Sequence, residues 1–335
     1  MSSHKKIRFG VLGCSRVAKR SVLPALAASP YAELRLVASR SVESAEACAK
    51  EYGSQASTFE EILANVDIDA VYISLPNSLH AQWVIRAAEA GKHVWCEKPA
   101  ALSYENAERM VAAARKKNVR LMEGFMFLSH PQHAKVREMI DAGILGDLLT
   151  FEGCFAVPMP AASSTILEKD LGGGCFYDAG MYPIAASRMI FGEEPKSVAC
   201  TLVMDPHTGV DVRADMMLTY LGGRSAHISA AFGSYFRSTY GVLGTEAHLT
   251  AARAYAVPKD RVTILLLNKN DVIQEITIEP ADHFQIMLDD FCEEIALGSA
   301  STKKYEEDLL AQARILDAGL LSHRERRFVN ISEIE

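Results

Sequence analysis

Ile7-Arg-Phe-Gly-Val-Leu-Gly13-Cys-Ser-Arg-Val-Ala18 joins a short apolar run to a glycine turn and the start of a helical pattern. A G-x-G-x-x-G/A motif in this context binds the pyrophosphate of a dinucleotide at the amino end of the helix. The motif positions are Gly13, Ser15 and Ala18. Ser15 departs from the usual glycine, but its side chain is small, and Ala18 lets the helix pack closely on the sheet. We therefore predict a dinucleotide-binding turn, with an ordinary structural turn as the alternative.

The first part of the chain has the pattern of a parallel sheet, because short β-branched runs alternate with longer helical patterns up to residue 123. Strands are predicted at residues 7–12, 34–39, 70–75, 93–97 and 120–123, and helices at 16–28, 44–52, 59–64, 81–90 and 103–117. Ser57 and Glu60 have the spacing of a capping box, and Pro24 predicts a kink in the first helix. We predict a Rossmann dinucleotide-binding domain over residues 1–123.

The pattern changes after a helix predicted over residues 130–142. Strand-length runs then recur with Gly, Asn or Asp turns between them, which is typical of an antiparallel sheet. These runs cover residues 151–156, 197–204, 212–221, 225–231, 248–251, 262–267 and 272–278, and further helices are predicted at 180–191, 283–297 and 305–322. The overall fold class is thus α/β, with an α+β domain over residues 124–335 built on a large, mainly antiparallel open sheet. Its terminal helices can pack back on the first domain.

Composition excludes several classes of protein. The 335 residues are 49% hydrophobic and 23% charged, which suits two domains with large cores. With a net charge of -7 and no basic block, we expect no nucleic-acid partner. No apolar run approaches the roughly 18 residues of a membrane span, and there is no signal-peptide core, so we expect a cytoplasmic protein without a membrane partner. The 7 scattered cysteines lack a C-x-x-C pair, which predicts mostly buried thiols.

The end of the second predicted strand indicates the cofactor. It reads Ala38-Ser39-Arg40-Ser41, with no acid before Glu43. Enzymes that prefer NAD commonly place an acid here to bind the adenosine ribose, whereas a guanidinium between two hydroxyls suits a 2'-phosphate. We predict NADP(H); the alternative is a solvated arginine, or one that only stacks on adenine.

Further motifs follow other predicted strands: Ile73-Ser-Leu-Pro-Asn77-Ser-Leu-His80, Cys96-Glu97-Lys98-Pro99 and Leu171-Gly-Gly-Gly-Cys-Phe-Tyr-Asp178-Ala-Gly-Met-Tyr182-Pro183. In this order they resemble, over nearly the whole chain, the glucose-fructose oxidoreductase and inositol dehydrogenase (Gfo/Idh/MocA) family. Glu123-Gly-Phe-Met-Phe-Leu-Ser-His-Pro-Gln-His133 and the Gly-Cys-Ser turn are most similar to its branch of NADP-dependent sugar 3-ketoreductases, which reduce C-3 keto groups of nucleotide-linked deoxysugars. The resemblance implies a Rossmann domain followed by a domain with a large open sheet.

The resemblance also implies catalytic roles for Lys98, Tyr182 and Asp178. Lys98 matches the family's active-site lysine, and Pro99 matches a proline that often follows a cis peptide bond. Tyr182 stands where this branch has a tyrosine general acid or base and many other members have histidine. Hydride transfer to a carbonyl leaves an oxygen that needs a proton, which Tyr182 would donate while Lys98 polarises the oxygen. Asp178 would orient the sugar hydroxyls or the lysine.

Cofactor and substrate residues are predicted from the same motifs. The cofactor-binding residues are Gly13, Cys14, Ser15, Arg16, Val17, Ser39, Arg40, Ser41, Leu75, Pro76, Asn77, His80, Glu97 and Lys98. The substrate-binding residues are Lys98, Phe127, His130, Asp178 and Tyr182. Glu97 is expected to reach the nicotinamide ribose, and His80 could equally be a structural cap. No metal site is predicted, because His130 and His133 lack a further ligand at a suitable spacing.

These observations predict an NADP-dependent oxidoreductase that transfers hydride between nicotinamide and a sugar carbonyl or hydroxyl, most specifically a C-3 ketoreductase of a nucleotide-linked (deoxy)hexose. One alternative is an NADP-dependent dehydrogenase of a free aldose, polyol or trans-dihydrodiol, for which the same residues would run the reaction backwards. Another is a catalytically inert dinucleotide-sensing regulator. The expected partners are a small sugar or nucleotide sugar, and a homodimer or homotetramer that forms through the open sheet face.

Overall fold

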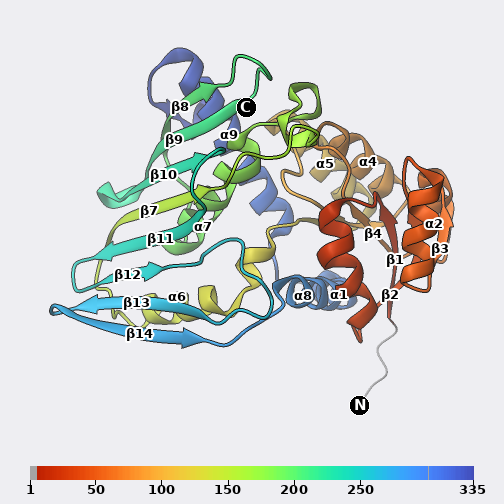
Figure 1. Ribbon diagram of the computed structural model, residues 1–335, viewed down its shortest axis with the longest axis horizontal. Coiled ribbons are helices and arrows are strands. Elements are labelled where there is room, and N and C mark those ends of the chain that lie inside the picture. Colours follow the sequence, from red (N-terminus) through yellow and green to blue (C-terminus); the bar gives the residue numbers. More distant parts are fainter. Residues whose placement is uncertain (1–5, 301) are drawn as a thin grey trace. The chain divides into compact units, whose positions relative to one another are not determined.

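The computed structural model describes residues 6–300 and 302–335, whose contacts divide them into two units (Figure 1). The first unit contains the chain up to Ala101, Glu105–Met126 and Phe284–Leu310. The second contains Leu102–Tyr104, Phe127–His283 and Ala311–Glu335. Each unit is therefore assembled from segments that are distant in the sequence.

The first unit is built on a six-stranded parallel sheet in the order β3-β2-β1-β4-β5-β6. Its strands are β1 (Ile7–Leu12), β2 (Ala32–Ala38), β3 (Gln55–Ser57), β4 (Ala70–Ile73), β5 (His93–Cys96) and β6 (Leu121–Glu123). The strand order reverses between β1 and β4, which is where open parallel sheets bind ligands. The parallel dinucleotide-binding sheet predicted for this region is confirmed; the short strand β3 was not predicted.

Helices connect these strands, and the first contains an irregular turn. They are α1 (Leu23–Ala28), α2 (Val42–Glu51), α3 (Phe59–Ala64), α4 (Asn77–Glu89) and α5 (Tyr104–Lys117). The helix predicted over residues 16–28 is present, and it contains a π-helical turn at Ala18–Val22 directly before α1. Pro24 is the second residue of α1 and has no N–H to donate to a carbonyl of the preceding turn. The irregularity expected from Pro24 therefore takes the form of a widened turn directly before it.

The capping box of α3 lies one residue later than predicted. Thr58 accepts a 3.2 Å hydrogen bond from the Glu61 amide, and the Glu61 carboxylate accepts one of 3.0 Å from the Thr58 amide. The Ser57 hydroxyl donates to the same carboxylate. Ser57 and Glu60 were the wrong pair, because adjacent hydroxyl and acidic residues offer the same spacing in two frames.

A late helix completes the core of the first unit. Helix α8 (His283–Leu297) contributes Phe284, Leu288 and Phe291 to an apolar cluster that also contains Phe9 of β1 and Leu26 of α1. The ring of Phe291 and the side chain of Leu288 are fully buried. Burial of each such side chain stabilises the unit by about 1.5–3 kcal/mol. The amino-terminal sheet thus depends on side chains encoded near the other end of the chain.

The second unit is built on a nine-stranded sheet in the order β14-β13-β12-β11-β7-β10-β9-β8-β15. Its strands are β7 (Leu148–Ala156), β8 (Ser197–Met204), β9 (Asp211–Thr219), β10 (Ser225–Ala231), β11 (Arg237–Gly244), β12 (His248–Ala251), β13 (Thr263–Lys269), β14 (Val272–Ile278) and β15 (Val329–Asn330). Strands β7 and β10 pair in parallel, and the other pairs are antiparallel. The prediction of a large, mainly antiparallel sheet is therefore confirmed.

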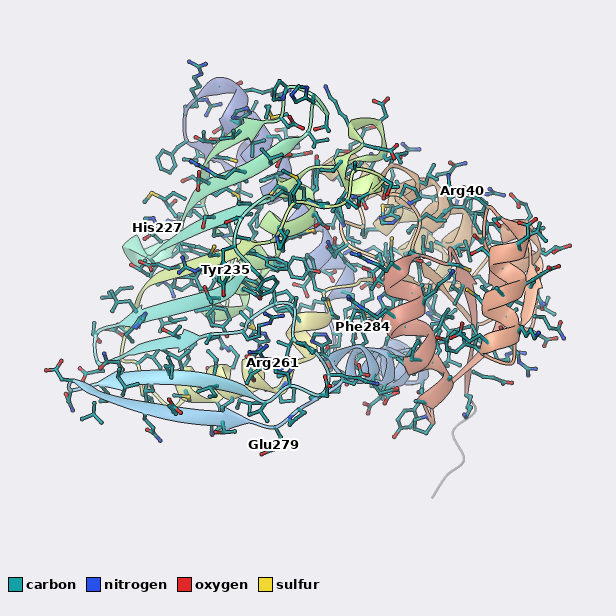
Figure 2. All side chains as sticks on the ribbon, in the orientation of Figure 1. Arg40, His227, Tyr235, Arg261, Glu279 and Phe284 are labelled. Atoms are coloured by element: carbon teal, nitrogen blue, oxygen red, sulfur yellow. The ribbon has the colours of Figure 1, made fainter. Side chains whose placement is uncertain are left out.

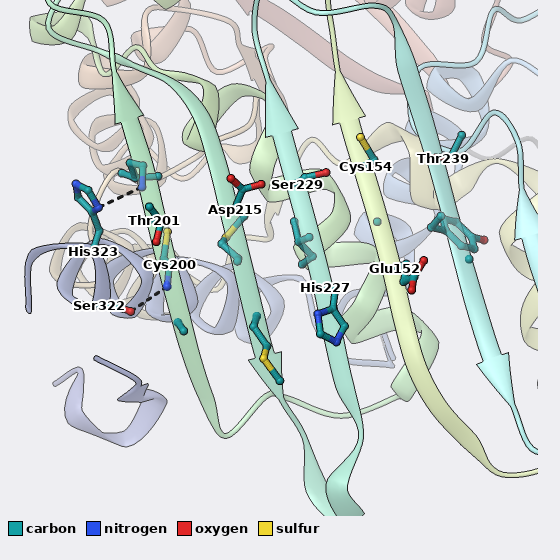
Figure 3. A pocket seen from close by; sticks show the side chains of 18 of the residues that line it. Glu152, Cys154, Cys200, Thr201, Asp215, His227, Ser229, Thr239, Ser322 and His323 are labelled. Carbon is teal, nitrogen blue, oxygen red and sulfur yellow. Dashed lines mark hydrogen bonds between the residues drawn. The ribbon is translucent and has the colours of Figure 1, made fainter. Parts of the chain in front are cut away.

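One face of this sheet carries helices and the other is open (Figure 3). The helices of this region are α6 (Pro131–Asp141), α7 (Met181–Phe191) and the second half of α9 (Tyr305–Glu325). The Ser322 hydroxyl accepts from the Cys200 amide at 2.9 Å, and His323 accepts from the Leu202 amide at 3.1 Å. These bonds satisfy backbone N–H groups of β8 near the edge of the sheet, where exposed groups would invite pairing with another chain.

The sequence predicted no membrane-spanning segment and mostly buried cysteine thiols. Within the described residues, no helix is long and apolar enough to span a bilayer. All seven cysteines are free, and only Cys14 and Cys154 are partly exposed. This agrees with the prediction of mostly buried thiols.

Candidate active site

The predicted cofactor residues of the first unit lie in segments that come directly after strands, at one edge of the parallel sheet. Leu12 of β1 pairs with Ala38 of β2 and Ile73 of β4, Ile73 pairs with Cys96 of β5, and Cys96 pairs with Glu123 of β6. The loops after these residues carry Gly13–Val17, Ser39–Ser41, Leu75–Asn77 and Glu97–Lys98. The sheet register therefore brings these predicted residues together on its carboxyl edge.

The turn after β1 requires glycine. Gly13 has φ +105°, and a Cβ at this position would lie 2.8 Å from the Ser74 carbonyl oxygen. Its amide donates to the Ala38 carbonyl at 2.9 Å, and its own carbonyl accepts from the Ser74 hydroxyl at 2.9 Å. The backbone of Gly13 is thus held between β2 and β4, where no side chain would fit.

Ser15, which replaces the second glycine of the motif, caps the helix. Its hydroxyl accepts a 3.1 Å hydrogen bond from the Ala18 amide, and its carbonyl accepts from the Lys19 amide. The amides of Arg16 and Val17 lie in the first turn, where a helix provides no acceptor. A helix start with free N–H groups attracts phosphate, so the departure from glycine leaves an anion-binding geometry intact.

Arg40 lies exposed after β2 (Figure 2). The neighbouring Ser41 hydroxyl accepts from the Ser44 amide at 3.1 Å to cap α2, and it donates to Glu43 at 2.7 Å. Its hydroxyl is therefore already engaged. No carboxylate among the described side chains forms an ion pair with Arg40. Arg40 remains available to a 2'-phosphate, whereas the contribution of Ser41 is largely structural.

The turn that carries Lys98 is braced from two sides. The Lys98–Pro99 peptide bond is cis, as the resemblance suggested. The ring of His80 contacts the Pro99 carbonyl at 2.7 Å and the Leu75 carbonyl at 2.8 Å. Glu123 accepts a 2.8 Å hydrogen bond from the Ala100 amide. His80 is 1% exposed, and burial lowers its pKa. The position of His80 suits the structural role that was the alternative to cofactor contact. Glu123, which holds the same turn, was not predicted from the sequence.

Glu97 and Lys98 are adjacent in the chain and follow β5. Glu97 is 9% exposed and accepts a 2.9 Å hydrogen bond from the Tyr72 hydroxyl. Burial raises the Glu97 pKa, while the hydrogen bond from Tyr72 and the positive charge of Lys98 lower it. Lys98 is half-buried and also acts electrostatically on His80. The lysine ammonium thus lies close enough to the Glu97 carboxylate to act on its charge.

In the second unit, Tyr182 lies at the start of α7 inside a cage of rings. Its ring centroid is 5.0 Å from that of Phe155, 5.5 Å from Phe127 and 5.9 Å from Tyr255. We call these three residues the aromatic cage. Tyr182 is 5% exposed, so the cage fixes the direction of its side chain. Sequence reasoning had identified Phe127 but not Tyr255, which carries no motif.

A buried carboxylate holds the segment that carries Asp178 and Tyr182. The Phe176 amide donates a 2.6 Å hydrogen bond to Asp211, at the start of the π-helical turn Phe176–Gly180. A Cβ on Gly174 would lie 2.2 Å from the same carboxylate, so the glycine makes room for it. Burial raises the pKa of Asp211 to about 6. Asp211 was missed, because nothing in the sequence relates this strand residue to a helix 35 residues earlier.

The predicted histidine His130 is the amino-terminal cap of α6. Its ring accepts a 3.3 Å hydrogen bond from the Gln132 amide, and it is 1% exposed. Nearby, the ring of His133 lies 3.0 Å from the Tyr240 hydroxyl and 3.1 Å from the Ala254 carbonyl. Burial lowers the pKa of His133 to about 3, so it is neutral. These contacts suit packing at the start of α6.

Comparison with known proteins agrees with this architecture. Residues 7–125 match a model described as an oxidoreductase family with an NAD-binding Rossmann fold. Residues 133–250 match the GFO/IDH/MocA C-terminal domain. A dTDP-3,4-didehydro-2,6-dideoxy-alpha-D-glucose 3-reductase of Actinomadura kijaniata is 33% identical over 313 residues, 93% of this chain and 94% of the relative.

This chain belongs to the GFO/IDH/MocA oxidoreductase family. The membership predicted from the motifs is therefore confirmed, as is its class as an oxidoreductase enzyme. Another relative of this oxidoreductase, a D-xylose 1-dehydrogenase (NADP(+)) of Haloferax volcanii, is 32% identical, with 92% of this chain and 95% of the relative covered. The crystal structure of a 3-ketoreductase from Actinomadura kijaniata in complex with NADP and TDP-benzene has a TM-score of 0.91 at 32% identity, covering 95% of this chain and 98% of that one.

Proposed function

We propose that this oxidoreductase is an NADP-dependent 3-ketoreductase of a nucleotide-linked hexose. The observation that carries the proposal is Tyr182, a tyrosine hydroxyl directed by the aromatic cage at the start of α7. The similar 3-reductase and the similar 3-ketoreductase structure support this substrate class, because they share nearly the whole chain.

The residues of the first unit fit NADP. The close backbone at Gly13 and the helix start after Ser15 suit a pyrophosphate. The exposed guanidinium of Arg40, without a carboxylate partner among the described side chains, suits the 2'-phosphate through charge-assisted bonds. With a net charge of -7, the chain as a whole repels phosphates, so these local groups must supply the attraction.

In the proposed mechanism, the turn at Gly13 and the guanidinium of Arg40 would hold NADPH, which would supply the hydride for the carbonyl carbon of the sugar. The Tyr182 hydroxyl then donates its proton to the carbonyl oxygen, and the ammonium of Lys98 stabilises the negative charge that develops there. Asp178, one helical turn before Tyr182, orients the sugar hydroxyls. In the reverse direction, the Tyr182 phenolate would accept the alcohol proton, and bound NADP would take up the hydride.

Steady-state kinetics test the proposal. NADPH consumption is followed with a dTDP-linked 3-ketohexose, and NADP reduction with free D-xylose, D-glucose and a trans-dihydrodiol. We expect kcat/KM to be highest for the nucleotide-linked ketone. Preference for a free aldose would instead support the dehydrogenase alternative, which the similar D-xylose dehydrogenase represents. Tight NADPH binding without turnover of any substrate would support the inert regulator.

We also propose that the open face of the nine-stranded sheet pairs with a second copy of the chain. The concave surface there carries the acidic side chains Glu152 and Asp215 and the basic side chains His227 and Arg237 (Figure 3). A twofold axis through this face can bring unlike charges together, as a self-complementary interface requires. Light scattering should show a dimer or tetramer, and Ser229→Arg should dissociate it, whereas Ala112→Arg on the exposed side of α5 should not. A monomeric parent protein would contradict the proposal.

A further inference from the structure

Two arginines lie close together in the loop over residues 252–262, between β12 and β13. Arg253 donates a 2.8 Å hydrogen bond to the Ala256 carbonyl, and its guanidinium lies 4.0 Å from the centroid of the Phe236 ring. Burial, and then the positive charge of Arg261, lower the pKa of Arg253. Among residues 6–300 and 302–335, no carboxylate forms an ion pair with either arginine. Like charges held together without an acid are stabilised by a bound anion.

The arginine pair lies at the end of the nine-stranded sheet where Phe155 of β7 contacts Tyr182 of α7. Ala156 of β7 pairs with both Ala231 of β10 and Arg237 of β11. The loops that follow β7 and β10 and the loop that precedes β11 therefore lie at the same end of the sheet. The Ala254 amide donates to the Ser238 carbonyl, which places the loop of the arginines beside the start of β11. Figure 2 labels Tyr235 and Arg261 on these two loops.

A line of ring contacts connects Tyr182 to this pair. Tyr182 contacts Phe155 at 5.0 Å between centroids, Phe155 contacts Phe236 at 6.4 Å, and Phe236 lies under Arg253. The adjacent Tyr235 is 91% exposed, so its ring has no packing role in the described structure. Exposed aromatic rings beside basic groups are the elements with which proteins stack bases and bind phosphates.

We propose that Arg253 and Arg261 bind the diphosphate of a nucleotide-linked sugar and that Tyr235 stacks on its base. This inference rests on the proposed function and deepens it by assigning the part of the substrate that does not react. The ring contacts lead from Tyr182 to Phe236, and both Arg253 and the exposed Tyr235 adjoin Phe236, so the reacting sugar would lie at Tyr182 and the diphosphate and nucleoside at the other end of this line. Two planar guanidinium groups can each form paired hydrogen bonds with phosphate oxygens, which explains arginine rather than lysine here.

Calorimetry on the full-length protein with NADPH present tests the site directly. The probes are dTDP, inorganic pyrophosphate and glucose 1-phosphate, which separate a nucleoside diphosphate from other phosphate sources. We expect dTDP to bind most tightly and the double variant R253Q/R261Q to weaken it by roughly 30-fold or more. Tyr235→Ala should weaken dTDP by about tenfold and leave pyrophosphate unchanged, since only the base is lost.

A matched control removes the same charge elsewhere. R109Q/R115Q replaces two exposed arginines of α5 in the first unit, where Arg115 pairs with Glu307 across a surface ion pair. This variant should bind dTDP as the parent does. It removes the same two positive charges as R253Q/R261Q, but at a site far along the chain from the arginine pair. An equal loss in both double variants would overturn the proposal in favour of a general effect of charge.

Kinetics separate this inference from the reaction itself. For a nucleotide-linked ketone, R253Q/R261Q should raise KM and leave kcat at saturation unchanged, because the arginines do not contact the reacting carbon. If the nucleotide-linked ketone is reduced but KM and dTDP binding do not change in the variant, the inference fails and the reaction stands. If dTDP binding depends on the arginines but no such ketone is reduced, the site stands and the proposed reaction fails.

Discussion

The Ser74 hydroxyl donates a 2.9 Å hydrogen bond to the carbonyl of Gly13 and so joins the ends of β4 and β1 where the strand order reverses. The backbone carbonyl oxygen of Ser74 leaves no space for a side chain on Gly13. The two halves of the parallel sheet are therefore joined at the residue that would face a pyrophosphate.

Gly13→Ala should abolish NADPH binding and destabilise the protein by roughly 2–5 kcal/mol, since it adds both backbone strain at φ +105° and an overlap with Ser74. Gly91→Ala is the matched control: its φ is +75°, but nothing lies within 4 Å of the added carbon. The control should lose only about 1–2 kcal/mol and bind NADPH normally. Chemical denaturation and fluorescence titration measure both effects, and equal losses in the two variants would contradict the steric argument.

Tyr182→Phe should lower kcat by about 10²- to 10⁴-fold, the usual contribution of a general acid. The ring would keep its place in the aromatic cage, so the affinity for NADPH and the unfolding midpoint should change little. Tyr177→Phe is the control, because it removes a 2.9 Å hydrogen bond to the Leu102 carbonyl and leaves the ring. The control should lose about 1 kcal/mol of stability and retain turnover. Full activity of Tyr182→Phe would exclude Tyr182 as the proton donor.

Arg40→Ala should weaken NADPH binding by about 1.5–3 kcal/mol, the range for hydrogen bonds to charged groups, and change NADH binding little. The comparison isolates the 2'-phosphate, which only NADPH carries. Arg35→Ala provides the control, since Arg35 lies on the same strand, is half exposed and pairs with Glu33. Fluorescence titration of both cofactors would reject the role of Arg40 if their affinities fell equally.

Asp211→Asn should change the pH dependence of stability. The Asp211 pKa is raised by burial from 3.8 to about 6, so the folded protein binds this proton more tightly than the unfolded chain. The contribution of Asp211 to the free energy of unfolding is therefore largest below pH 4 and falls as pH rises to about 6. Asparagine keeps an acceptor for the Phe176 amide but cannot ionise.

The stability of Asp211→Asn relative to the parent should thus increase by up to about 3 kcal/mol between pH 4 and pH 7. His133, whose pKa is lowered to about 3, acts in the opposite direction, but it is present in both proteins and cancels in the difference. Urea denaturation at several pH values measures this difference. A difference that does not vary with pH would show that Asp211 does not titrate as inferred.

The sequence predicted where strands and helices lie better than it predicted which strands pair with each other. The run from Ile7 to Leu12 was identified to the residue, because its apolar pattern is local. The parallel pairing of β7 with β10 was not predicted, since it joins residues such as Phe151 and Ala226 that are far apart in the chain. Pairing between distant strands depends on the packing of the whole sheet, which a local pattern does not contain.

In the candidate site too, local motifs were easier to predict than contacts between distant segments. Gly13 was predicted as a cofactor residue from its turn between a strand and a helix, and Lys98 and Tyr182 were predicted from motifs that resemble those of the family. The residues that hold them, Glu123 and Asp211, were missed, because each acts on a backbone amide of a distant segment.

Helix α8 has a practical consequence for anyone who wishes to exchange parts between relatives. Because Phe284, Leu288 and Phe291 belong to the apolar core around Phe9, a gene fragment that stops at Met126 would expose that core to water, at roughly 25 cal/mol for each Å² uncovered. A working chimaera must carry the segment Phe284–Leu310 together with the amino-terminal sheet. Substrate specificity should therefore be transplanted as an internal cassette rather than by joining two halves.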